Sequence, residues 1–133
     1  MKKVMVFGTF DVLHPGHTHM LKEAKEYGDY LVVVVARDST VEQVKRKKPL
    51  NDQETRIKNV QTLNLADAVL LGYEDDKHRI VAEEKPQVVA LGYDQKFFIE
   101  DLENALEDDA QIVRLSPYFP EKYKSSLLAP DQD

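Results

Sequence analysis

Hydrophobic positions along this chain gather into short runs, and the segments between the runs carry hydrophobic residues at helical spacing. Tyr30–Ala36 is a continuous valine-rich run without polar alternation, which predicts a strand covered on both faces, as in a parallel sheet. Lys3–Phe7 is apolar and β-branched and ends before Gly8, which predicts a second buried strand. Three shorter runs complete the set of expected strands: Ala68–Leu71, Val88–Leu91 and Gln111–Leu115.

Helices are expected between these strands. Gly28 follows the first helix and is a candidate C-cap, and Asp52 is a candidate N-cap of the third. The alternation of strand and helix predicts an α/β fold, a single Rossmann-like domain with a doubly wound, parallel, five-stranded sheet and helices on both faces. The expected helices are Thr18–Tyr27, Asp38–Val44, Asp52–Leu63, Lys77–Glu84 and Phe98–Leu106.

The length of 133 residues fits one domain with a single core, which we place at residues 1–128, followed by a disordered tail at residues 129–133. Charged residues make up 32% and hydrophobic residues 42% of the chain, as in folded soluble proteins. The net charge of −6 argues against a general nucleic-acid binder, because a phosphate backbone needs a basic face.

Composition also excludes several kinds of chemistry. The chain has no cysteine, which rules out disulfides, thiol catalysis and cysteine-ligated metals. Its longest apolar runs are too short to span a bilayer, and its first residues form a predicted strand rather than a signal peptide. We therefore expect a cytoplasmic protein with no membrane partner.

The most informative segment follows the first expected strand and contains His-Pro-Gly-His at positions 14–17. The second histidine falls on the first turn of a helix, so both rings can face one phosphate. Gly8 lets a ligand approach the backbone at the strand end, and Thr9 adds a hydroxyl. The helix N-terminus supplies N–H groups and the positive end of its dipole. The segment predicts a phosphate site; the alternative is a pair of helix-start histidines without chemistry.

Other polar segments also fall at the carboxyl ends of expected strands, where ligands bind in a doubly wound sheet. Arg37 and Asp38 follow the second strand, and Gly-Tyr-Asp-Gln at 92–95 follows the fourth. Arg114 closes the fifth strand, and Tyr-Lys-Ser-Ser at 123–126 lies beyond it. We interpret Asp38 as structural, as a cap or as a hydrogen-bond acceptor in its loop. The convergence of these segments on one edge is stronger evidence for a site than any one motif.

The segment Val6–His17, with Gly-Thr-Phe-Asp at the strand end and His-x-Gly-His at the helix start, resembles the signature of the HxGH nucleotidyltransferases, the cytidylyltransferase-like superfamily. These enzymes attach a nucleoside monophosphate to a phosphate-bearing acceptor and release pyrophosphate. A catalyst of this transfer mainly positions the reactants and stabilises negative charge. His14 and His17 are the predicted catalytic donors to that charge. A divalent metal, Mg²⁺, is expected to bind through the triphosphate oxygens and not through protein side chains.

Lys45–Lys48 is a run of four cations. A solvated charge run is one interpretation, but the position of the run resembles the flexible lysine loop of the family. The resemblance makes Lys47 the expected catalytic lysine, in contact with the triphosphate and the acceptor phosphate, with Lys48 second. Arg56 resembles the arginine that follows this loop and binds phosphate, and its alternative role is a surface ion pair with Asp52.

The resemblance further implies a set of nucleotide-binding residues. Some of them have structural alternatives: a helix N-cap for Asp94, an ordinary serine N-cap in the segment Lys124-Ser125-Ser126, and a salt bridge at the rim for Arg114. His19 lies outside the motif, and we interpret it as a surface or packing residue. The expected nucleotide-binding residues are Gly8, Thr9, Phe10, His14, His17, Gly92, Asp94, Arg114, Tyr123, Ser125 and Ser126.

Within the superfamily, several segments resemble the archaeal FAD synthases. That resemblance implies transfer of AMP from ATP to FMN, giving FAD and pyrophosphate, by a homodimer. The glycerol-3-phosphate cytidylyltransferases, which use CTP, share the first motif, but their closing segment is of the type Arg-Thr-Glu-Gly-Ile-Ser-Thr-Thr, from which this chain departs. Further alternatives are an adenylyltransferase acting on a sugar phosphate and a non-catalytic nucleotide-binding module. The segments that resemble FAD synthases are Val35–Asp38, Lys48-Pro49, Leu91–Gln95, Arg114–Tyr118 and Tyr123–Ser126.

Overall fold

The computed structural model describes residues 2–73, 78–92, 106 and 109–115, and everything said below about structure concerns these residues. Its strands lie where the hydrophobic runs predict them, with ends that differ by one residue at most. The strands are β1 (Lys3–Gly8), β2 (Tyr30–Val35), β3 (Ala68–Leu71), β4 (Val88–Leu91) and β5 (Gln111–Arg114).

These strands form one sheet with the order β3-β2-β1-β4-β5, and every pairing in it is parallel. In the centre of the sheet, Met5 of β1 lies beside Val32 of β2 and Val89 of β4. The chain builds outward from β1 to β3, then crosses to the other side of β1 to form β4 and β5. The prediction of a doubly wound parallel sheet is confirmed, and its switch point lies between β1 and β4.

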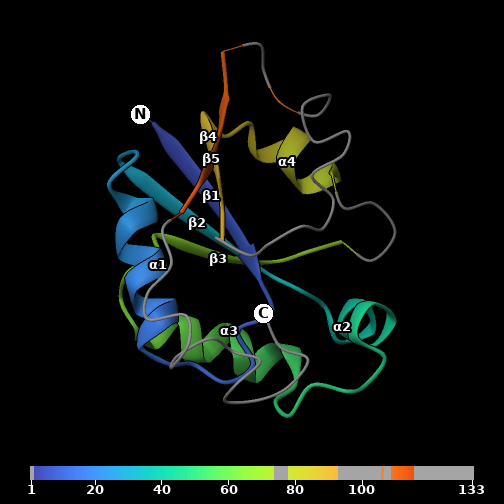
Figure 1. Cartoon of the computed structure of the whole chain (residues 1–133). Coiled ribbons are helices and arrows are strands. Elements are labelled where there is room, and N and C mark those ends of the chain that lie inside the picture. The colour runs from blue at the N-terminus through green and yellow to red at the C-terminus, as the bar shows by residue number, and fades with distance from the viewer. Residues whose placement is uncertain (1, 74–77, 93–105, 107–108, 116–133) are drawn as a thin grey trace.

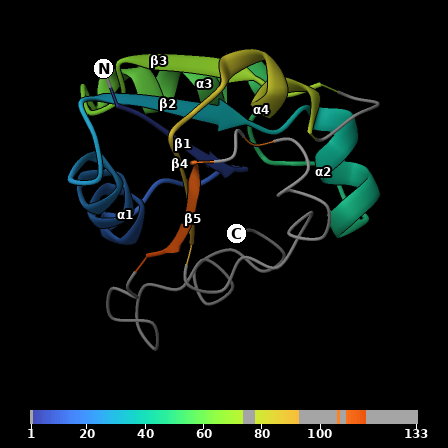
Figure 2. The same ribbon diagram turned by 90° about the horizontal axis from the view of Figure 1, so that it is seen from above.

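Successive strand residues point to opposite faces, and both faces carry a buried apolar layer. On one face, Val4 and Val33 pack with Leu21 and Val60, which come from helices α1 (Pro15–Lys25) and α3 (Gln53–Thr62). On the other face, the partners of the strands include Ile80 of α4 (Arg79–Glu84). Figure 1 shows α1 and α3 on one side of the sheet and α4 on the other, and Figure 2 shows α1 and α2 (Asp38–Lys45) far apart, with α2 beyond the end of β2. This double cover explains why the strands show no polar alternation.

Helix α1 begins at Pro15, three residues before the predicted start at Thr18, because His14 caps it and proline suits the first helical position. It ends at Lys25 with Glu26 as its C-cap in a right-handed conformation. The prediction that Gly28 is the C-cap was therefore wrong. A Cβ atom at that position would lie 2.5 Å from the Lys2 carbonyl oxygen, so glycine permits a close approach of two backbones there.

Helices α2 and α3 follow β2 in the chain and lead to the carboxyl edge of the sheet and back. Helix α2 (Asp38–Lys45) follows β2 and lies beyond its carboxyl end (Figure 1). The predicted N-cap of α3 is confirmed, since the carboxylate of Asp52 accepts a hydrogen bond from the Thr55 N–H at 2.8 Å. The helix predicted at 98–106, apart from Leu106, and the tail at 129–133 lie outside the described residues.

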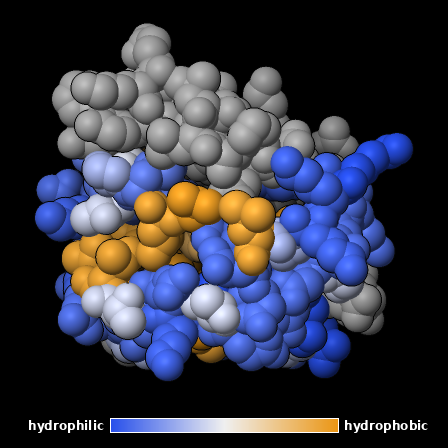
Figure 3. All heavy atoms as spheres, turned by 90° about the horizontal axis from the view of Figure 1, so that it is seen from below, coloured by the Kyte–Doolittle hydropathy of each residue, from blue (hydrophilic) through white to orange (hydrophobic). Residues whose placement is uncertain are grey.

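Seen from below, the molecule exposes a band of hydrophobic surface between hydrophilic regions (Figure 3). Among large hydrophobic residues in the described part of the chain, Leu50 is the one classed as exposed, with 75% of its surface accessible. It follows the basic run in the loop between α2 and α3. None of the helices that the structure describes is both long enough and apolar enough to cross a membrane.

Candidate active site

The loop that leaves β1 enters the site region at the switch point of the sheet. Its first residues are tightly packed, with Thr9, Phe10 and Asp11 only 6%, 0% and 2% exposed. Gly8 is the last residue of β1 and lies beside Val35, the last residue of β2. A buried loop at this place holds its backbone in one conformation, which is the requirement for a rigid ligand-binding edge.

Phe10 has a left-handed backbone with φ of 55°, which is rare for a bulky residue. Its ring lies in the core cluster, with its centroid 5.4 Å from that of the His17 ring. The core packing of the aromatic ring therefore holds a strained turn directly before the histidine motif. Phe10 as a whole residue is 0% exposed, so the structure gives it a packing role beside the histidine motif.

His14 and His17 form a reciprocal cap at the start of α1. The Nδ1 atom of His14 accepts a hydrogen bond from the Gly16 N–H at 3.0 Å, and Nδ1 of His17 accepts one from the His14 N–H at 3.3 Å. The two ring centroids are 4.1 Å apart. Since both Nδ1 atoms act as acceptors, each neutral ring carries its proton on Nε2. The pair can therefore donate two hydrogen bonds to a phosphate without being protonated.

The N-terminus of α1 adds to this electrostatic character. The first turn of this helix contains no acidic residue, and its last turn carries Lys22 and Lys25. Its dipole therefore presents an uncompensated positive end beside the two histidines, which is a favourable place for negative charge. His19, farther along the same helix, lies 3.4 Å from the Glu23 carboxylate, in agreement with its interpretation as a surface or packing residue.

The basic run starts at the end of α2. Lys45 is the last residue of that helix, and Arg46 turns the chain with a left-handed φ of 62°. Lys47 and Lys48 are exposed in the following loop. The loop then returns to the first motif, because the backbone N–H groups of Leu50 and Asn51 donate to the Asp11 carboxylate.

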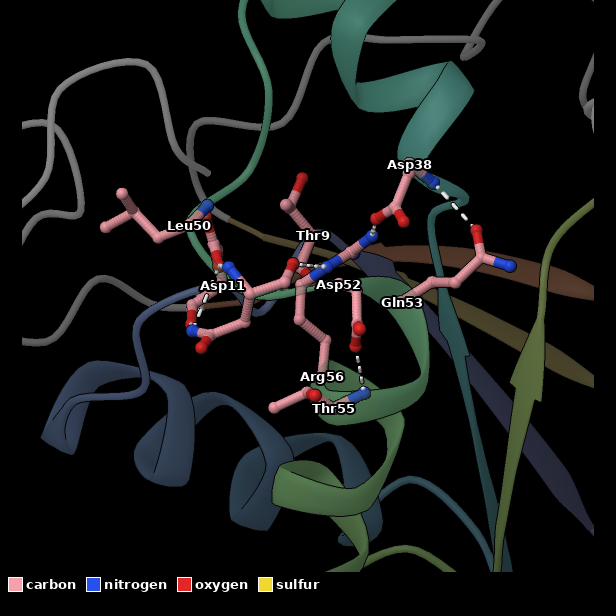
Figure 4. A network of polar contacts seen from close by, with 9 residues as sticks. Thr9, Asp11, Asp38, Leu50, Asp52, Gln53, Thr55 and Arg56 are labelled. Atoms are coloured by element: carbon pink, nitrogen blue, oxygen red, sulfur yellow. Dashed lines mark hydrogen bonds and ion pairs between the residues drawn. The ribbon is translucent and has the colours of Figure 1, made fainter.

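Arg56 is fully buried, so its alternative role as a surface ion pair with Asp52 was wrong. Its Nη2 atom lies 2.6 Å from the carboxylate of Asp38, and its Nε and Nη1 atoms donate to the carbonyls of Asn51 and Thr9 at 3.0 and 2.9 Å. Figure 4 shows this guanidinium at the centre of the polar network.

The interpretation of Asp38 as structural is confirmed, because its carboxylate holds this guanidinium. All three nitrogens of the Arg56 guanidinium donate to protein oxygens. The geometry therefore gives Arg56 a structural role, and a contact with phosphate would have to use a remaining N–H of Nη1 or Nη2.

Two further members of this network were missed by the sequence analysis: Asp11 and Asn51. Both look like ordinary polar loop residues, and one of them belongs to the Gly-Thr-Phe-Asp segment that was recognised for its glycine and threonine. For Asp11, the available signal was its position directly after the apolar Phe10, which suggests that its carboxylate is drawn toward the interior and needs hydrogen-bond donors. Leu50 and Asn51, whose N–H groups donate to the Asp11 carboxylate, lie 39 and 40 positions after it in the chain. No local sequence pattern predicts contacts at such a separation.

The ends of β4 and β5 are linked at the other side of the switch point. Arg114 donates from Nη1 to the carbonyl of Gly92 at 2.9 Å. The two predicted residues therefore lie together, with Arg114 exposed at the rim. Four expected nucleotide-binding residues lie outside the described part of the chain: Asp94, Tyr123, Ser125 and Ser126.

The pKa of the Asp52 carboxyl is lowered by hydrogen bonds from the side chain and backbone of Thr55, as expected for an N-cap. In the part of the chain that the structure describes, no group of three or more histidine, cysteine, aspartate or glutamate side chains is placed to hold a metal ion.

The model of the Cytidylyltransferase-like family matches residues 5–128, and the chain belongs to this family. It is a nucleotidyltransferase.

Relatives named FAD synthase are similar over most of the chain. The FAD synthase of Thermoplasma acidophilum is 44% identical over 131 residues, which are 96% of this chain and 92% of that protein. The FAD synthase of Aciduliprofundum boonei is 44% identical over 121 residues, which are 89% of this chain and 80% of that protein.

Solved structures show the same architecture. The lipopolysaccharide core biosynthesis protein from Thermoplasma volcanium GSS1 matches with a TM-score of 0.80 and 45% identity, covering 89% of this chain and 98% of that chain. Pantoate-beta-alanine ligase from Francisella tularensis matches with a TM-score of 0.59 at 15% identity, covering 98% of this chain and 69% of that chain, and shares the fold.

Proposed function

We propose that this protein is an FMN adenylyltransferase that converts ATP and FMN into FAD and pyrophosphate. The observation that carries the general reaction is the pair of histidines whose Nδ1 atoms are held by backbone N–H groups at the start of α1. The choice of ATP and FMN rests on the similarity to proteins named FAD synthase over 96% and 89% of the chain.

In the proposed reaction, a phosphate oxygen of FMN attacks the α-phosphorus of ATP. The bond from the α-phosphorus to its bridging oxygen breaks, and pyrophosphate leaves with the bonding electrons. The Nε2–H groups of His14 and His17 donate to the phosphate oxygens on which negative charge increases. The ammonium groups of Lys47 and Lys48 hold the triphosphate and the FMN phosphate. A divalent metal such as Mg²⁺ would be held by the triphosphate and not by side chains of this chain, and it would neutralise part of the charge on the leaving group.

The predicted nucleotide contacts complete this arrangement. Main-chain groups of Gly8 and Thr9 approach the nucleotide at the end of β1, and Gly92 and Arg114 do so from the ends of β4 and β5. Asp94 and the Tyr-Lys-Ser-Ser segment at 123–126 contribute the remaining contacts of the proposed site. The homodimer and the cytoplasmic location stay predictions.

The proposal is tested by pyrophosphate release with ATP or CTP, each combined with FMN or glycerol 3-phosphate, in the presence of Mg²⁺. We expect release with ATP and FMN together and formation of FAD, and no release after chelation of the metal. Release with CTP and glycerol 3-phosphate alone would assign the cytidylyltransferase reaction instead. Absence of turnover with all four pairs would contradict the proposed substrates.

Replacement of Lys47 by alanine is expected to lower kcat/KM for ATP by about tenfold to a hundredfold, the effect of losing one hydrogen bond to a charged group. The exposed position of Lys47 makes a large loss of stability unexpected. Steady-state kinetics measures the effect. Lys58→Ala, at an exposed position on α3, removes the same charge away from the basic run and serves as the matched control. Equal kinetics for Lys47→Ala, Lys58→Ala and the unchanged protein would make the basic run a solvated surface.

A further inference from the structure

Asp11 connects the loop after β1 with the segment that follows the basic run. Its side chain is 2% exposed, in the loop between β1 and the histidine motif. One carboxylate oxygen accepts from the Leu50 N–H at 2.6 Å, and the other accepts from the Asn51 N–H at 2.8 Å. The Asn51 side-chain amide donates to the Asp11 carbonyl at 2.7 Å and to its carboxylate at 3.2 Å. We call these four hydrogen bonds the Asp11 clasp.

The clasp is a strong attachment for a loop. Hydrogen bonds to a carboxylate are stronger than bonds between neutral groups, and burial strengthens them further. Arg56 reinforces it, because the same guanidinium donates to the carbonyls of Thr9 and Asn51. The backbone around residue 51 is therefore fixed to the β1 loop by two independent charged groups.

The other end of this chain segment is fixed as well. At the start of α2, the Asp38 carboxylate pairs with Arg56, and the Asp38 N–H donates to the Gln53 side chain at 2.9 Å. Helix α2 and the basic run therefore form a chain segment whose two ends are both held by the same polar network. Four residues, 46–49, join the helix to the clasp, and each spans at most about 3.5 Å. So short a connection keeps Lys47 and Lys48 close to the β1 loop.

We propose that Asp11 is a positioning residue, whose carboxylate holds the basic run so that Lys47 and Lys48 meet the phosphates beside the histidine pair. Asp11 acts through backbone N–H groups and does not touch the substrate. This inference rests on the proposed function for its kinetic part, while the attachment of the loop stands on the hydrogen bonds alone. It predicts that the effect of Asp11 on catalysis passes through the lysines.

A double-mutant cycle with Asp11→Asn and Lys47→Ala separates positioning from general damage. Asparagine keeps the shape of Asp11 but removes the charge and turns one acceptor into a donor that faces a backbone N–H. We expect kcat/KM for ATP to fall by about tenfold in the protein with Lys47, and by less than about threefold in the Lys47→Ala background. Equal losses in both backgrounds would overturn the proposal.

Limited proteolysis gives a readout that needs no substrate. Trypsin cleaves after Lys45, Arg46 and Lys47, and mass spectrometry of the products measures the rate at each bond. We expect Asp11→Asn to accelerate these cleavages severalfold at a temperature where circular dichroism shows the fold intact. Asp29→Asn is the matched control, since that exposed carboxylate accepts one backbone N–H from Lys2 and lies away from the basic run. Unchanged cleavage in Asp11→Asn would overturn the clasp.

Two additional arms complete the test. If Asp11→Asn does not fold, Asn51→Ala replaces it. This substitution removes the side-chain amide contacts of residue 51 and leaves the backbone N–H groups of residues 50 and 51 in place. We expect the same non-additivity with Lys47→Ala, with a smaller effect.

A changed Mg²⁺ concentration for half-maximal activity, with unchanged proteolysis, would make Asp11 a metal ligand and overturn the proposal. If the unchanged protein makes no FAD, the substrate assignment fails, and proteolysis still decides the clasp.

Discussion

Replacing His17 by alanine is expected to lower kcat by at least about a hundredfold, because loss of one preorganised donor to a developing charge has this effect in other enzymes. The Nε2–H of His17 is held in place by the bond from the His14 N–H to Nδ1 and by the packing of its ring beside Phe10. Preorganisation of this kind requires no rearrangement at the moment of reaction. Single-turnover formation of FAD from ATP and FMN measures the loss directly.

The fold is expected to survive this change. The bond that His17 accepts from the backbone is one N-terminal contact of α1, and the loss of such a cap costs about 1 kcal/mol. His19→Ala, on the same helix and paired with Glu23, serves as the control and is expected to keep the activity. A rate for His17→Ala near that of the unchanged protein would remove the histidine pair from the mechanism.

The second large effect is expected for Arg56→Ala, which should lower the free energy of unfolding by about 3–5 kcal/mol, because it truncates a large, fully buried side chain and leaves two carbonyls without their donor. Arg56 is fully buried, and its removal leaves the Asp38 carboxylate without its cation and the Thr9 and Asn51 carbonyls without this donor. It also opens a cavity the size of a long side chain. Urea denaturation followed by circular dichroism gives the value.

The control for this prediction is Arg79→Ala. Arg79 is exposed on α4 and lies 3.4 Å from the Glu83 carboxylate, four residues along the helix. A solvent-exposed pair of this kind contributes about 0–1 kcal/mol. If the two variants lost similar stability, the buried network around Arg56 would not have the structural role that its contacts indicate.

The structural features that were predicted well are those determined by residues close together in the sequence. The valine run of β2 has to be covered on both faces, and together with the spacing of strands and helices this predicts a doubly wound parallel sheet. The Asp52 cap was also predictable, since a carboxylate before a helix needs only a backbone N–H three residues later. The start of α1 was placed late because the hydrophobic period begins after the cap, and the cap is made by a histidine, which is not a usual N-cap residue.

The amino-acid sequence by itself determined the class of fold, and it predicted a phosphate site at the strand ends, formed by the histidine pair and the cations of the basic run. These depend on periodicity and on residues a few positions apart. The tertiary structure alone decided that Arg56 is a buried structural residue rather than a surface charge. It also decided that the Asp11 carboxylate binds the backbone directly after the basic run, about 40 residues farther along the chain. The physical reason is that an ionised side chain is stable in the interior only where the fold supplies its partners, and no local pattern records which distant backbone groups those will be.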